Sequence, residues 1–339
     1  MPIKVLGASE ENSMPLIEVR GLCKNYQVFK RQKGFLNNIK TLFNREYETV
    51  EAVKDVNFSL NEGELVGYVG SNGAGKSTTI KMLCGILVPS SGEVNVNGVV
   101  PHKNRKQNAK NIGVVFGQRS QLNWDLPTED TFELYKRMYK IEDAPYKRNV
   151  ELFTELLGMQ DFIRRPVRQL SLGQKMRAEI AISLLHDPKI LYLDEPTIGL
   201  DVDVKDRIRK FARALRDEKK TTIILTTHDM ADIDEICERI IMIDKGQILV
   251  DKPLDEYKHE FNNEYYIEVA FADKASVPET IEPRFEVVAR MDNRLVCKFL
   301  RDDVPVREAM LYFSSAFDIV DVNIRNAKLD EIVRAFYNR

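Results

Sequence analysis

One glycine-rich segment constrains the fold of this chain more than any other feature. Residues 70–78 read GSNGAGKST, which matches GxxxxGK[ST], and they lie between an apolar strand-like run and a helical run. Glycines let backbone N–H groups turn toward an anion, and the helix that follows adds its dipole. The alternative is a plain turn between a strand and a helix, but this context favours a loop that binds nucleotide phosphates. Lys76 would then hold the β- and γ-phosphates, and Ser77 would ligate Mg²⁺.

An acidic pair ends a second apolar run, ILYLDEP. The carboxyl ends of buried parallel strands lie at one edge of a sheet, so Asp194 and Glu195 are expected beside the phosphate loop. Asp194 would hold Mg²⁺, and Glu195 would polarise an attacking water. The alternative is a solvated pair at the start of a loop, which the presence of Lys76 disfavours.

His228 follows the next apolar run, TTIIL, within the sequence TTHD. It could contact the γ-phosphate and position both Glu195 and the attacking water. It could equally be a structural histidine at the end of a strand. The residues alone leave these two interpretations open.

The order of strand-like and helical runs indicates an α/β fold. The two kinds of run alternate up to about residue 252, which is typical of a largely parallel sheet. Beyond Pro253, half-buried strand patterns and two helical segments predict a separate small α+β domain. The predicted division is therefore a polar tail over 1–14, a large domain over 15–252 and an accessory, regulatory domain over 253–339.

Composition bears on the partners of the chain. The formal net charge is −2, which gives no electrostatic reason to expect a nucleic acid. The four cysteines form no CxxC pair, so neither a zinc site nor a disulfide framework is indicated, and a reducing, cytoplasmic setting is the simplest interpretation. No run approaches the ~20 apolar residues that span a bilayer. Work at a membrane would therefore need a separate membrane-spanning protein.

The segment LSLGQ, residues 170–174, places a second polar helix start shortly before the acidic pair. Ser171 and Gln174 form the pattern S-x-x-Q, which predicts a capping box at the N-terminus of a helix. A capped helix N-terminus also attracts anions. The two interpretations are compatible, so the residues predict both a cap and an anion site.

These motifs follow one another as in the ATP-binding cassette (ABC) family, which the chain resembles over about residues 15–250. LSLGQ is a variant of the family's LSGGQ signature, in which Leu172 replaces the first glycine. The resemblance implies a P-loop ABC nucleotide-binding domain with a RecA-like core, an antiparallel β subdomain and a helical subdomain at 120–180. It also implies ATP and Mg²⁺ as cofactors and ATP hydrolysis as the activity.

The resemblance assigns roles to single residues. The catalytic residues would be Lys76, Gln118 of the Q-loop, Glu195 and His228. The ligands of Mg²⁺ would be Ser77, Gln118 and Asp194. ATP would be bound by Tyr26, Gly70, Ser71, Asn72, Gly73, Ala74, Gly75, Lys76, Ser77, Thr78, Ser171, Gly173, Gln174 and Asp201 of the D-loop. Tyr26 would stack on adenine, with Tyr47 as the alternative, because the segment over 29–46 lengthens the gap before the phosphate loop.

The resemblance also implies partners. In this family the signature faces the γ-phosphate bound by a second subunit, which implies a homodimer of cassettes. Single cassettes of this layout usually power transport, which implies a separate integral-membrane permease and a peripheral position on the inner face of the cell membrane. The separate C-terminal domain and the segment LGMQDFIRRPVRQL are most similar to cassettes of ABC-2 type exporters. The alternative is a non-transport ABC ATPase that acts on the ribosome or on DNA.

A cationic insertion over residues 29–46 interrupts the β-rich beginning of the large domain. It places apolar residues near helical spacing beside several Lys and Arg residues. Docking on a permease or on an anionic membrane surface is one interpretation. An ordinary surface segment that packs on its own domain is the other, and both stay open.

Overall fold

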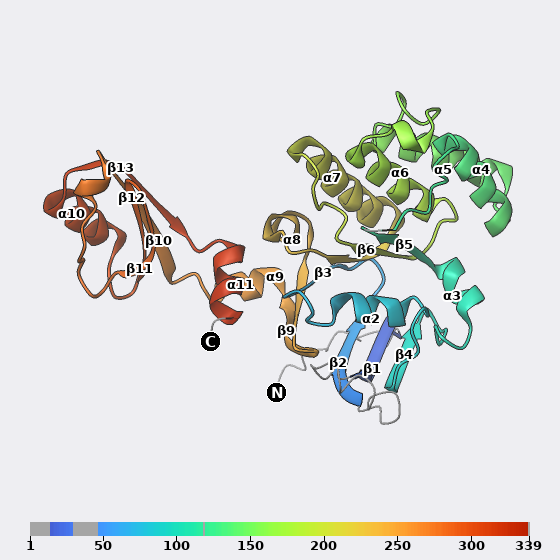
Figure 1. The fold of residues 1–339 in the computed structure, drawn as a ribbon, viewed down its shortest axis with the longest axis horizontal. Coiled ribbons are helices and arrows are strands. Elements are labelled where there is room, and N and C mark those ends of the chain that lie inside the picture. The colour runs from blue at the N-terminus through green and yellow to red at the C-terminus, as the bar shows by residue number, and fades with distance from the viewer. Residues whose placement is uncertain (1–13, 30–46, 118, 338–339) are drawn as a thin grey trace, which may run out of the picture. The chain divides into compact units, whose positions relative to one another are not determined.

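The structure is a computed structural model, and it describes residues 14–29, 47–117 and 119–337 of the 339-residue chain. Gln118 and residues 30–46 of the cationic insertion lie outside the described residues, so the predictions for them stay predictions. The chain divides into two compact units (Figure 1). The first unit comprises residues 1–228 and 235–251, and the second comprises residues 229–234 and 252–339.

A six-stranded sheet forms the centre of the first unit. Its order is β5-β6-β7-β3-β8-β9, and the first five of these strands run parallel, as predicted. Every residue of β6 and β7 is buried, which explains why neither strand shows an alternating pattern. The strands are β3 (Leu65–Gly70), β5 (Ile112–Phe116), β6 (Ile190–Asp194), β7 (Thr222–Thr226), β8 (Arg239–Asp244) and β9 (Gln247–Pro253).

A three-stranded antiparallel sheet packs on the core through α2. Its order is β2-β1-β4, and α2 lies between it and the six-stranded sheet (Figure 1). One hydrophobic cluster joins the two sheets and the helix, with Val53, Tyr68 and Ile80 among its buried members. The bounds are β1 (Ile17–Phe29), β2 (Tyr47–Leu60), β4 (Ser91–Val96), α2 (Lys76–Leu83) and α3 (Arg105–Asn111).

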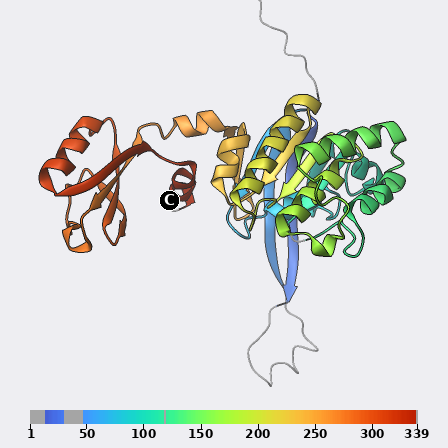
Figure 2. The ribbon, with the colours of Figure 1, turned by 90° about the horizontal axis from the view of Figure 1, so that it is seen from above.

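Four longer helices cover the opposite face of the six-stranded sheet (Figures 1 and 2). The helix α4 ends where Lys140 adopts a positive φ of 55°, and α5 begins three residues later at Asp143. Leu134 and Met138 lie on the same side of α4 and are 48% and 62% exposed, so their apolar stripe faces outward. The helices are α4 (Thr128–Tyr139), α5 (Asp143–Leu156), α6 (Leu172–Leu184) and α7 (Val202–Lys219).

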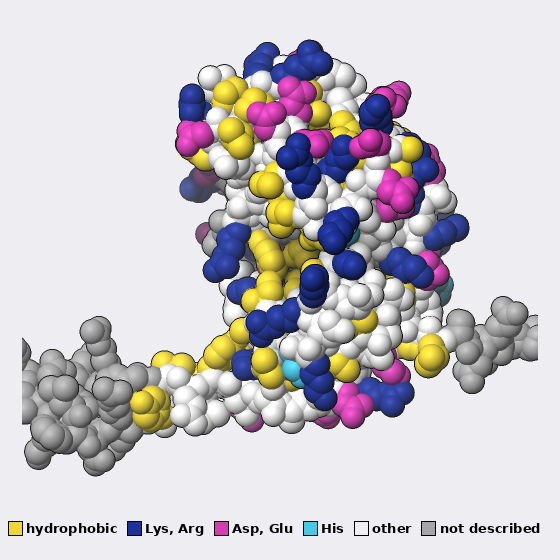
Figure 3. Space-filling model, turned by 90° about the vertical axis from the view of Figure 1, so that its right-hand side faces the viewer, with side chains coloured by type: hydrophobic (Ala, Val, Ile, Leu, Met, Phe, Trp, Pro, Cys, Tyr) yellow, Lys and Arg dark blue, Asp and Glu magenta, His cyan; other side chains and the backbone are white. Residues whose placement is uncertain are grey.

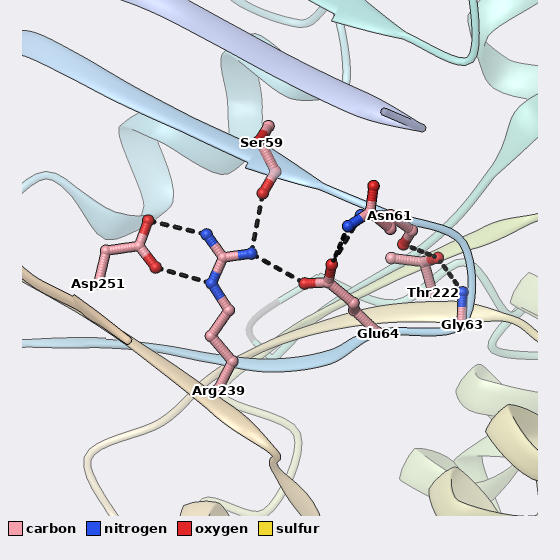
Figure 4. Close-up of polar contacts among 7 residues, drawn as sticks. All are labelled: Ser59, Asn61, Gly63, Glu64, Thr222, Arg239 and Asp251. Carbon is pink, nitrogen blue, oxygen red and sulfur yellow. Dashed lines mark hydrogen bonds and ion pairs between the residues drawn. The ribbon is translucent and has the colours of Figure 1, made fainter. Parts of the chain in front are cut away.

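Arg239 links the three-stranded sheet to the six-stranded sheet of the first unit (Figure 4). Its guanidinium donates two bonds to Asp251, of 2.7 and 2.9 Å, in a bidentate pair. The same group donates to the Ser59 carbonyl oxygen and to Glu64, both at 2.9 Å. One side chain therefore joins the ends of β2 and β9 to the starts of β3 and β8. The other residues of the network are Asn61, Gly63 and Thr222.

The second unit is built on a four-stranded antiparallel sheet of order β11-β12-β10-β13. Alternate residues of β10 and β12 face an aromatic core, which includes Phe299 of β12 and Phe313 of α10. This alternation confirms the half-buried strands predicted there. The edge strand β13 was not predicted. The bounds are β10 (Glu264–Phe271), β11 (Glu286–Met291), β12 (Arg294–Leu300), β13 (Ile319–Asn326), α8 (Met230–Ile236), α9 (Leu254–His259), α10 (Val306–Ala316) and α11 (Leu329–Tyr337).

Candidate nucleotide-binding site

The phosphate loop joins the end of β3 to the start of α2. Gly73 and Gly75 have φ values of 83° and 112°, which residues with side chains rarely adopt. A Cβ on Gly75 would lie 2.6 Å from the carbonyl oxygen of Ala52. Gly75 is also the N-cap of α2, and no side chain caps this helix. The first N–H groups of α2 are therefore left for an anion, as the glycine pattern predicted.

Lys76 is the first residue of α2, and its ammonium group lies within the loop. Nζ donates to the carbonyl oxygens of Gly70 at 2.6 Å and Ser71 at 3.1 Å. Burial lowers the pKa of Lys76, and the nearby carboxylates of Glu195 and Asp194 oppose this shift. The loop thus holds a largely buried cation beside the N-terminus of a helix, which suits a chain of phosphate groups.

Three oxygen-bearing side chains meet at the carboxyl ends of β6 and β7, beside the start of α2. Asp194 Oδ1 accepts hydrogen bonds from Thr226 Oγ1 at 2.5 Å and from Ser77 Oγ at 3.3 Å. A carboxylate and a hydroxyl are the hard oxygen ligands that Mg²⁺ takes together with water and phosphate oxygens. Ser77 and Asp194 therefore fit the predicted metal role. Thr226, which orients the carboxylate, was not predicted.

Glu195 lies directly after Asp194, with a φ of 59°. A left-handed conformation costs a residue with a side chain roughly 1 kcal/mol or more, so the fold holds Glu195 there against its preference. His228 Nδ1 lies 2.6 Å from Glu195 Oε2. The two side chains are joined although they lie 33 positions apart in the chain. This contact favours the interpretation in which His228 positions Glu195.

The segment LSLGQ begins α6, and its predicted capping box is confirmed. Ser171 Oγ accepts from the Gln174 N–H at 3.2 Å, and Gln174 Oε1 accepts from the Ser171 N–H at 2.9 Å. A Cβ on Gly173 would lie 3.0 Å from Val204, so α6 packs tightly on α7 at this point. Asp201 caps α7, since its Oδ1 accepts from the Val204 N–H at 2.9 Å. These residues bond to one another rather than to the phosphate loop.

The strand register bears on which tyrosine lies nearer the loop. Tyr26 lies opposite Val50 on β2. Two residues farther along β2, the carbonyl oxygen of Ala52 adjoins Gly75 of the phosphate loop. Tyr47 lies three residues from Val50 in the other direction, at the start of β2. The register therefore favours Tyr26 over Tyr47 as the adenine contact.

Two further hydrogen bonds in this region join residues that lie far apart in the sequence, and no local motif indicates them. Ser71 Oγ donates to Asp244 Oδ1 at 3.0 Å, and Asp244 ends the buried strand β8 as Asp194 ends β6. Gln118 itself is not described, but the preceding Gly117 donates its N–H to the Asp194 carbonyl oxygen at 2.9 Å. Gly117, which precedes the predicted Q-loop glutamine, therefore lies beside the acidic strand end.

In the described part of the chain, no helix is both long enough and apolar enough to cross a membrane.

Comparison with known proteins agrees with this geometry. The sequence model of the ABC transporter family matches residues 53–198. The ATP-binding protein NatA of Bacillus subtilis (strain 168) is 33% identical over 214 residues, which are 63% of this chain and 87% of NatA. The bacitracin transport ATP-binding protein BcrA of Bacillus licheniformis is 31% identical over 71% of this chain and 77% of BcrA.

A solved structure shows the same fold. The ATP-binding cassette MJ0796, in a dimeric post-hydrolysis state bound to ADP and Pi, has a TM-score of 0.58 and is 26% identical. The match covers 70% of this chain and 98% of MJ0796. It supports the interpretation of the phosphate loop and of the neighbouring strands as an ATPase core. The chain belongs to the ABC transporter family, as an ATP-binding protein that hydrolyses ATP.

Proposed function

We propose that two copies of this chain close on two ATP molecules and power export through a separate integral-membrane permease. The observation that carries the proposal is the division of the site. Lys76, Asp194 and Glu195 form one complete half around the phosphate loop, whereas Ser171 and Gln174 bond to each other at the start of another helix. A second copy would supply the missing half to each site, and a two-fold axis would supply both at once.

The phosphate half assigns a task to each side chain. Lys76 neutralises the β- and γ-phosphates, and the N–H groups at the start of α2 bind their oxygens. Ser77 and Asp194, with Gln118 as the third ligand, would hold Mg²⁺, which when bound neutralises charge that develops on the phosphates. Glu195 accepts the proton of the attacking water, and its bond to His228 fixes the direction in which its carboxylate points.

The signature half would add a hydroxyl donor. Ser171 Oγ accepts from Gln174 N–H, so the hydroxyl proton of Ser171 remains to be donated to a phosphate oxygen. The first turn of α6 contains no acidic residue, so the helix dipole at this end is not neutralised by its own side chains. The cap and the phosphate contact are therefore compatible, and Gly173 and Asp201 set the position of this end of α6 against α7.

Coupling to a permease would follow from a shift between open and closed pairs. ATP stabilises the closed pair, and hydrolysis removes that preference. The name of BcrA, a bacitracin transport ATP-binding protein, supports a role in transport. Hydrophobic side chains also gather in a hollow rimmed by Lys and Arg on the face of the cassette that carries α4 (Figure 3). Such a surface suits a permease loop, and it would hold the chain at the inner face of the cell membrane.

The closure is tested with the Glu195→Gln variant of the full chain. Sedimentation velocity with saturating ATP and Mg²⁺ should show a dimer, because the variant binds ATP but hydrolyses it slowly. The wild-type chain with ADP serves as the control and should stay monomeric. A monomer of Glu195→Gln under these conditions would overturn the paired-cassette mechanism.

The transport role is tested by purification of the tagged chain from membranes in mild detergent. A polytopic membrane protein in a fixed ratio to the chain is the expected result. Loss of the chain, or Lys76→Ala in its place, should raise the accumulation of the exported compound in cells. Copurification with ribosomes or DNA in place of a membrane protein would contradict the proposal.

A further inference from the structure

One buried carboxylate joins the loop that follows β5 to the helix that carries the signature through several hydrogen bonds. Glu179 lies in the middle of α6 and is 5% exposed. It accepts hydrogen bonds from the Ser120 hydroxyl, from the Gln121 N–H at 3.0 Å and from the Leu122 N–H at 3.4 Å. Burial of a carboxylate is costly unless donors of this kind share its charge. Donors from three consecutive residues therefore stabilise this buried carboxylate.

The same loop starts beside the acidic end of β6. Gly117 donates its N–H to the carbonyl oxygen of Asp194, at the end of β6. Three residues later, Ser120 is bonded to Glu179 of α6. Gly117 therefore lies beside the end of β6, and Ser120 lies beside the helix that begins at the signature. Gln121 stiffens this passage, since its side chain bonds both to Val114 of β5 and to Tyr135 of α4.

We propose that Glu179 is a positioning residue that makes residues 120–122 and α6 move as one body. Glu179 lies eight residues from Ser171, or ~12 Å along a continuous helix. A displacement of the loop beside Asp194 would then be carried along α6 to the Ser171 hydroxyl. The inference rests on the proposed function, because the signature acts only when a second cassette closes on it. Glu179 would therefore control closure without touching ATP.

The test uses the Glu195→Gln chain as the parent, so that dimers accumulate. Glu179→Ala should raise the ATP concentration for half-maximal dimer about tenfold, because residues 120–122 are then no longer bonded to α6 through a charged acceptor. Glu179→Gln, which keeps an acceptor, and Ser120→Ala, which changes an exposed side chain, should each give a smaller shift in the same direction. Binding of a fluorescent ATP analogue to the monomer at low protein concentration should not change.

A matched control separates positioning from general stability. Asn149 is also fully buried and ties α5 to α6, since its Nδ2 donates to the Leu185 carbonyl oxygen at 3.1 Å, but the bonds of its side chain run to Leu185 and Lys219 rather than to the loop. Asn149→Ala should lower the Tm and leave dimerisation unchanged. If Glu179→Ala and Ser120→Ala formed dimers at the same ATP concentration as the parent, this inference would be overturned and the proposed function would stand. A parent that never dimerises would overturn the proposed function and this inference with it.

Discussion

Two helix N-termini of this chain belong to the proposed ATP site, and they are capped in different ways. At α2 the cap residue is Gly75, and no side chain accepts from the first N–H groups. At α6 Ser171 and Gln174 satisfy each other's N–H groups in a full capping box. The N–H groups at the start of α2 therefore need an external acceptor, whereas those at the start of α6 are partly satisfied from within. If two cassettes close as proposed, α2 would bind ATP first, and α6 of the second copy would join later with a weaker contact.

The surroundings of the two N-termini sharpen the contrast. Asp194, Glu195 and His228 lie around α2 and are bound to one another or to residues of the loop. Around the start of α6, Lys175 lies over the Trp124 ring, 4.2 Å from its centroid, and no acidic residue stands in the first turn. In the proposed mechanism the catalytic side chains thus lie at α2 alone, and α6 would supply positive potential and one hydroxyl. Substitutions at α2 should therefore have larger effects than those at α6.

The largest effect is expected for Lys76→Ala. Removal of the buried cation leaves the β- and γ-phosphates without their main neutralising charge, so the rate of ATP hydrolysis should fall at least about 100-fold. The measurement is release of inorganic phosphate by the purified full chain. Lys81→Ala, in the last turn of the same helix, is the control and should keep wild-type hydrolysis. Equal losses in both variants would mean that α2 was merely destabilised.

Glu195→Gln should reduce turnover by about 10²–10⁴, because the amide cannot take the proton of the attacking water. Its affinity for ATP should stay near that of the wild type, since Lys76 and the loop are unchanged. Single-turnover kinetics with a separate binding measurement distinguish the two effects. His228→Ala should lower the rate less, as it removes only the side chain that orients Glu195. If the rate of hydrolysis fell further in His228→Ala than in Glu195→Gln, the roles assigned to the two residues would be reversed.

The contrast between local and long-range contacts also explains how much the sequence could predict. The start of α2, the buried strand β6 and the capping box of α6 are specified by neighbours within a few residues, and all three predictions are confirmed. The bonds of Asp194 to Thr226 and of Ser71 to Asp244 span 32 and 173 positions. Such partners are set by the order of strands in the sheet, which no local pattern contains.

Periodicity has a similar limit. The spacing of Leu134 and Met138 fits one side of the helix α4, but spacing alone does not show that this side faces outward. The run IVDVNIRN over 319–326 was not predicted as a strand. Its pairing with β10 makes it β13, and only Ile319, Val322 and Ile324 of the run pack against the core of that sheet. Element type follows from the local pattern, whereas exposure and pairing follow from the assembled fold.

Ser171→Ala should have a moderate effect on two properties. Loss of the cap should destabilise the chain by about 1 kcal/mol, and loss of the hydroxyl donor should weaken ATP-dependent dimerisation about tenfold. Asn104→Ala is the matched control, because Asn104 caps α3 through the Gln107 N–H and lies in neither half of the site. Thermal unfolding should show a similar cost for both variants. If Asn104→Ala also impaired dimerisation, the effect of Ser171 would be structural.

The smallest effect is expected for Leu172→Gly, which restores the residue of the family signature. Leu172 is 54% exposed at the first position of α6, and a Cβ added to Gly199 would lie 3.4 Å from its side chain. The capping atoms belong to Ser171 and Gln174, so α6 should keep its capping box after the substitution. Dimerisation should shift by less than about threefold, and stability by less than about 1 kcal/mol, since glycine costs a helix little at its first turn. A large gain in dimerisation would instead show that Leu172 holds the signature away from the second ATP, and that the second half of the site is restrained by this side chain as well as by its cap.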